Sequence, residues 1–70
     1  MAKSKKKNVK FLVSGMVTWL HRSGKETRRY IEQGKVLKLR VDEDHLTGGY
    51  RLWDGSASII MDKAKVEISD

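Results

Sequence analysis

The sequence predicts an all-β domain: a small antiparallel barrel or strongly bent sheet of five or six strands, SH3-like or OB-like in type. Short runs of alternating apolar and polar residues recur along the chain, and turn signals separate them at spacings of about 8–12 residues. Proline and cysteine are both absent from the 70 residues. The fold therefore has no disulfide framework and no thiolate metal site.

The chain is expected to form a single domain preceded by a basic tail. Seventy residues fit one hydrophobic core but not two. Residues 1–8 contain four lysines, and Met1 is their only large apolar residue. We therefore expect residues 1–8 to be a disordered basic tail and residues 9–70 to be a single small β domain.

Residues 9–22 are the most ambiguous segment. As a strand, they place Phe11 and Trp19 on one mostly apolar side. Their β-branched and aromatic content favours a strand, and Gly15 in a helix costs about 1 kcal/mol relative to alanine. In a long strand, Gly15 suits a bulge or a bend. The alternative is an α+β domain with a helix within residues 9–33.

The remaining elements follow from alternation and turn residues. Ser23-Gly24 and Gly34 predict turns, and residues 42–49 predict an acidic segment followed by a loop. Asp54-Gly55 lies between two β-like runs, which predicts a hairpin with a type I′ turn. The expected strands cover residues 26–33, 35–41, 50–53, 56–61 and 65–69.

The charge is unevenly distributed along the chain. There are 15 Lys and Arg residues against 9 Asp and Glu, for a net charge of +6. Residues 1–40 contain 12 basic and 2 acidic residues, giving +10, whereas residues 41–70 contain 3 and 7, giving −4. A polyanionic partner is therefore expected to meet the first half of the chain.

Catalysis and metal binding have little support. His21 and His45 are far apart and have no metal-ligand spacing, and the glycines match no phosphate-binding pattern. Successive residues in the acidic segment 42–45 point to opposite sides if it is extended. We therefore expect no enzyme, no metal and no cofactor.

Basic residues interleaved with aromatic ones favour nucleic-acid binding instead. If the predicted strands at 26–33 and 35–41 pair, their outward residues form one cationic sheet surface that contacts phosphates, with low sequence specificity. Tyr30 and Trp53 are candidates for stacking on bases, whereas Phe11 and Trp19 are expected in the core. The predicted binding residues are Lys10, Arg22, Lys25, Arg28, Arg29, Tyr30, Lys35, Lys38, Arg40 and Trp53. The target is DNA or RNA, with the lysine-rich tail adding non-specific attraction.

Two alternatives remain open. One is a small protein-interaction module or regulator, of phage or plasmid type, acting on a partner protein. Leu12, Met16 and Leu20 on the even side of the first strand then form the contact, or the seam of a homodimer. The other is a membrane-surface protein, which requires an amphipathic helix at residues 9–20. No membrane partner is expected on the preferred hypothesis, and the location is cytoplasmic or nucleoid-associated.

Overall fold

The computed structural model describes residues 5–70, which form seven strands and one short 3₁₀ helix. Every strand pair is antiparallel, so the predicted all-β fold is confirmed. The elements are β1 (Lys6–Phe11), β2 (Gly15–His21), β3 (Glu26–Ile31), β4 (Val36–Glu43), β5 (Tyr50–Asp54), β6 (Ala57–Met61), η1 (Lys63–Lys65) and β7 (Val66–Ser69).

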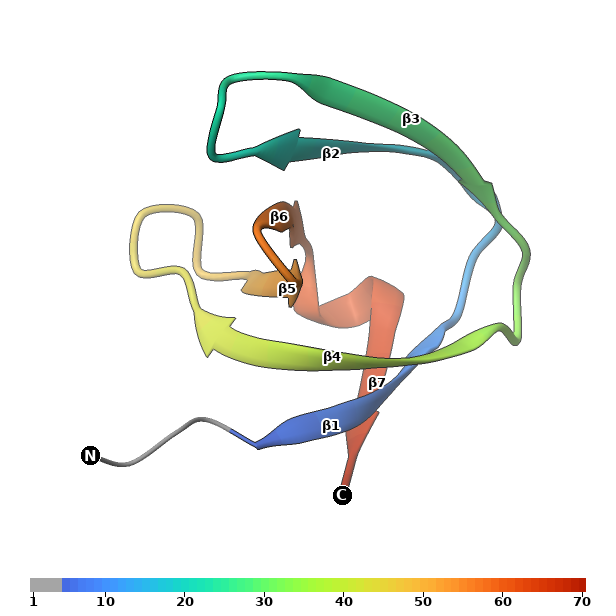
Figure 1. Cartoon of the computed structure of the whole chain (residues 1–70). Coiled ribbons are helices and arrows are strands. Elements are labelled where there is room, and N and C mark those ends of the chain that lie inside the picture. Colours follow the sequence, from blue (N-terminus) through green and yellow to red (C-terminus); the bar gives the residue numbers. More distant parts are fainter. Residues whose placement is uncertain (1–4) are drawn as a thin grey trace.

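The strands form one curled sheet in the order β3-β2-β6-β5-β4-β1-β7. Figure 1 shows the β2–β3 hairpin on one side of the curl and β1 with β4 on the opposite side. Within residues 5–70, β3 and β7 each have one unpaired edge, so the sheet does not close into a barrel. The expectation of five or six strands is also wrong, because the first predicted strand is two strands.

The chain bends sharply between β1 and β2. Leu12 to Ser14 leave the sheet, and β2 begins at Gly15, so residues 9–22 do not form one continuous strand. The bend lets β1 pair with β4 and β7 while β2 pairs with β3 and β6. Residues 9–20 lie mainly in strands, so the helix of the α+β and membrane-surface alternatives does not form.

The start of β1 corrects the predicted tail. Lys6 to Asn8 are paired with β4, opposite Arg40, Leu39 and Lys38, so order begins before residue 9. Every lysine has a backbone N–H and C=O, so a lysine-rich segment can hydrogen-bond to β4 although its side chains remain in solvent. Residues 1–4, which include Lys3 of the predicted tail, lie outside the described residues.

The core lies on the concave side of the sheet. Val9, Phe11, Leu39 and Leu52 point inward from their strands and are almost completely buried. Trp19 is 2% exposed, so the prediction that Phe11 and Trp19 are core residues is confirmed. The other buried apolar residues are Ile31, Ala57, Ile59 and Val66.

The β5–β6 turn differs from the prediction. Asp54 pairs with Ala57, so the two central turn residues are Gly55 and Ser56, where Asp54 and Gly55 were expected. Gly55 has a φ of +63°, whereas no non-glycine residue described has a positive φ. This is the pattern of a type II′ turn, in which the first central position favours glycine. The hairpin itself is as predicted.

Gly49 is required by a close approach of two backbones. A Cβ atom at this position would clash with the carbonyl oxygen of Met61 in β6, whereas a Cβ at Gly15 would meet no atom within 4 Å.

Gly49→Ala is therefore expected to lower the free energy of unfolding by about 1–3 kcal/mol, as overpacking does. Gly15→Ala is the matched control and should change it by less than about 1 kcal/mol. Urea denaturation measures both, and equal effects would contradict the explanation.

Candidate nucleic-acid interface

A cationic surface lies on the outward side of β1 and β4. Lys6 lies opposite Arg40, Asn8 opposite Lys38, and Lys10 opposite Val36. Opposed residues share one side of a sheet, and the intervening Val9 and Leu39 are buried in the core. The basic side chains therefore all point away from the core. We call Lys6, Lys10, Lys38 and Arg40, together with Arg51 and Trp53 of β5, the basic face.

Trp53 organises the arginines of this face. The guanidinium carbons of Arg40 and Arg51 lie 4.9 and 5.8 Å from the centroid of the Trp53 ring, within cation–π range. The Trp53 indole Nε1 donates a hydrogen bond to Asp42 (3.0 Å), and Asp42 also lies 3.9 Å from Arg40. Trp53 was predicted to stack on bases, but its ring already contacts guanidinium groups.

Asp44 supports this arrangement from the loop between β4 and β5. Its carboxylate accepts hydrogen bonds from the Thr47 hydroxyl (2.6 Å) and the Thr47 backbone N–H (3.2 Å), and lies 4.0 Å from Arg51. The hydrogen bond from the Thr47 hydroxyl is the main cause that lowers the pKa of Asp44, while burial opposes it. The hydrogen bonds from Thr47 thus hold the loop together and stabilise the charged form of the Asp44 side chain.

A second group of predicted residues lies on the β2–β3 hairpin. Arg22 and Lys25 are exposed at its tip, and Arg28 lies on the outward side, opposite Thr18. Tyr30 follows on the same side, opposite Met16. The expectation that the strands at 26–33 and 35–41 pair is wrong: β3 pairs with β2, while β4 pairs with β1 and β5. The two basic groups therefore lie on opposite sides of the curl (Figure 1).

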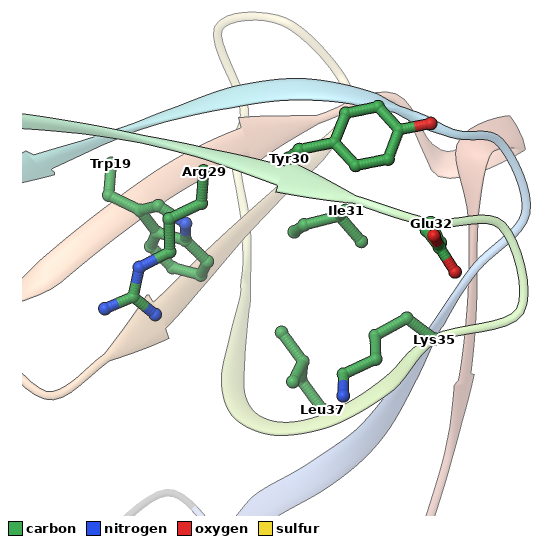
Figure 2. Close-up of a pocket in the computed structure, with 7 residues that line it drawn as sticks. All are labelled: Trp19, Arg29, Tyr30, Ile31, Glu32, Lys35 and Leu37. Carbon is green, nitrogen blue, oxygen red and sulfur yellow. The ribbon is translucent and has the colours of Figure 1, made fainter.

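Arg29 and Lys35 belong to neither group. They lie on the rim of a cavity of about 380 Å³ at the open seam between β3 and the start of β4 (Figure 2). We call this the seam cavity. Its lining residues are Trp19, Arg29, Tyr30, Ile31, Glu32, Lys35 and Leu37. The side chains of Ile31 and Leu37 approach it from the two strands (Figure 2).

The structure thus divides the ten predicted binding residues into three places. The basic face holds Lys10, Lys38, Arg40 and Trp53; the outward hairpin holds Arg22, Lys25, Arg28 and Tyr30; the cavity rim holds Arg29 and Lys35. Sequence reasoning missed two members of the basic face. Lys6 had been assigned to the tail, and Arg51 lies in the acidic half of the chain.

Apolar side chains are exposed on the outward side of β2 and its neighbours. Met16 is 63% and Leu20 51% exposed, and Tyr30 and Ile60 are also exposed large apolar residues. Leu12, the third residue predicted for a protein contact, is only partly exposed because it lies in the bend. Its backbone N–H donates to the carbonyl of Lys65 (2.9 Å).

Comparisons of the chain with protein-family models, with curated proteins and with solved structures found no significant match. The part of the chain that the structure describes has no helix of the length and apolarity needed to span a bilayer.

The lowered pKa of Asp44 predicts a specific loss of stability in acid. Its charged form is favoured by folding, so its contribution is complete above the pKa of the unfolded chain and disappears as pH falls through the lower, folded pKa. The free energy of unfolding should therefore fall below about pH 4. Asp44→Asn should lower stability at neutral pH and flatten this acid dependence. Urea denaturation at several pH values measures it, and an unchanged acid slope in the variant would contradict the assignment.

Proposed function

We propose that this chain is a non-enzymatic nucleic-acid-binding protein that contacts the phosphate backbone through the basic face. The observation that carries the proposal is the alignment of Lys6, Lys38 and Arg40 on the outward side of two paired strands, with Lys10 beside them. Residues two apart on one strand are about 7 Å apart, and neighbouring strands are about 4.8 Å apart. The cations therefore form a compact grid that a polyanion contacts at several points.

The charge of the basic face supports the proposal. Within residues 5–70, Lys6, Lys10 and Lys38 have no ion-pair partner, whereas Arg40 has a long contact with Asp42. Glu67 of β7 lies opposite Lys10 and marks the border of the surface. Neutralising phosphates with these cations releases counterions, which drives binding and makes it depend on salt.

Low sequence specificity is part of the proposal. Reading base edges needs an element that enters a groove, commonly an α-helix or a β-ribbon. The described residues form a curved sheet and one 3₁₀ turn of three residues, and the cations of the basic face are on the outward side of that sheet. Such a surface suits backbone contacts. The all-β architecture does not by itself assign a function.

A second candidate is supported by the exposed apolar residues on β2 and β3. Met16 and Tyr30 lie directly opposite each other on the outward side, and Leu20 is on the same side. Such a surface suits a second copy of the chain, because the same residues meet across a two-fold axis. Dimerisation here leaves the basic face of each copy free, so the two candidates are compatible.

Nucleic-acid binding is tested by removing unpaired cations. The double variant Lys10→Gln, Lys38→Gln should weaken binding of both single- and double-stranded oligonucleotides. It should also reduce the slope of log affinity against log salt by about 1.4–1.8, the value for two lost phosphate contacts. The matched control, Arg22→Gln with Lys25→Gln, removes the same charge from the hairpin tip and should change the slope much less. Fluorescence anisotropy measures both, and a larger effect in the control would assign binding to the hairpin.

The dimer is tested by a charge placed on its expected contact. Leu20 and Val36 are 51% and 49% exposed, so they form a matched pair on different parts of the sheet. Leu20→Lys should raise the dimer dissociation constant by about tenfold or more, because it buries a charge in the contact. Val36→Lys should not. Sedimentation equilibrium measures the association, and a wild-type chain that stays monomeric at all concentrations would exclude this candidate.

A further inference from the structure

The seam cavity lies beside an unpaired strand edge. His21 N–H donates to the carbonyl of Lys25 (2.8 Å), so this is a hydrogen-bonded pair of the β2–β3 ladder. Hydrogen-bonded and non-hydrogen-bonded pairs alternate along an antiparallel ladder. The backbone N–H and C=O groups of Thr27, Arg29 and Ile31 therefore point towards β2. The backbone N–H and C=O groups of Arg28 and Tyr30 therefore face the open edge, where no strand pairs with them within residues 5–70.

The other side of the seam is also incompletely paired. β4 pairs with β5 from Arg40 onwards, whereas its first residues, from Val36 to Leu39, pair with β1 alone among the described strands. The cavity thus opens between two strands that each keep free backbone groups. An extended segment entering here meets hydrogen-bonding groups and not only side chains.

The cavity has an apolar floor and a cationic rim. Trp19, Ile31 and Leu37 supply apolar surface, and Arg29 and Lys35 supply positive charge, against the single acidic residue Glu32. Arg29 lies 3.9 Å from Asp54, but these side chains are 61% and 52% exposed. A long, solvated ion pair of this kind contributes little and exchanges easily for another carboxylate.

Trp19 contributes its ring to the wall of the cavity. The residue is 2% exposed, and its indole Nε1 is buried without a hydrogen-bond partner in the described part of the chain. An occupant of the cavity therefore packs beside the ring of Trp19, and the indole N–H resonance reports on that contact.

From these features, we infer that the seam binds an extended segment of a partner protein in which an apolar residue is flanked by acidic ones. The segment adds to β3 as a further strand, bonding to the backbone of Arg28 and Tyr30. Its inward apolar side chain fills the seam cavity. The acidic residues that flank it point to the outward side, where Arg28 lies, because successive side chains of a strand alternate between its two sides. Arg29 and Lys35 on the rim add attraction at longer range. This site is separate from the basic face.

Peptide titration of the whole chain tests the inference. The probe is a capped heptapeptide of alternating glutamate and leucine, with a lysine–leucine peptide as its control. The glutamate peptide should shift the backbone amide resonances of Arg28 and Tyr30 and the indole resonance of Trp19, while the resonances of Lys6 on the basic face stay in place. The lysine peptide should cause no such shifts. Equal binding of the two peptides, or shifts centred on the basic face, would overturn the inference.

Two further comparisons separate strand addition from simple charge attraction. Arg28→Glu should weaken binding of the glutamate peptide by about tenfold or more, because charge-assisted contacts on the outward side are lost. Arg22→Glu makes the same charge change at the hairpin tip and should have a much smaller effect. N-methylation of the peptide at alternate residues should abolish binding in one of its two registers. Unchanged binding of both methylated peptides would show that no strand is added. Self-association that protects the edge of β3 without peptide would show that the occupant is a second copy.

Discussion

The structure depends on one constraint: a single sheet has to bury its only apolar side against itself. Among the described residues no α-helix and no second sheet covers the concave side, so the strands curl around Phe11, Leu39 and Leu52. A chain of this size has little other apolar surface to bury. The bend between β1 and β2 makes the curl possible, because it lets one stretch of chain contribute to both sides. The incomplete closure that results leaves the seam cavity.

Local pattern was sufficient to predict much of this fold. The period-2 alternation identified the strands at 35–41 and 65–69 and the side that each one buries. Composition and turn residues identified the other strand regions. Glycine-containing turns located the β2–β3 and β5–β6 hairpins because tight turns join neighbouring strands. The pairing of β1 with β4 and β7 had no such signal. It joins segments distant in the chain, and it is decided by how the whole sheet bends.

The same distinction explains the binding surfaces. The sequence indicated which residues are basic and outward, but the assumption that successive strands pair placed Arg28 and Lys38 on one surface. The structure separates them because β2, β6 and β5 lie between β3 and β4 in the sheet. The Trp53 contacts with Arg40 and Arg51 depend on the register of β4 and β5, and the seam cavity depends on an edge left unpaired. Neither feature can be predicted from the residue pattern of a single strand, because each depends on how two strands are placed relative to each other.

The charge on β3 has two consequences for an exposed edge. An unpaired strand invites pairing with other chains, and charged side chains are a common protection. Antiparallel pairing of two β3 strands over most of their length brings Arg28 or Arg29 opposite its own copy, and like charges in that position are destabilising. The same arginines favour an acidic strand. Repulsion of one class of partner and attraction of another is how an open edge gains specificity. The positive charge on this edge therefore both limits self-pairing and selects the chemistry of the strand that the seam accepts.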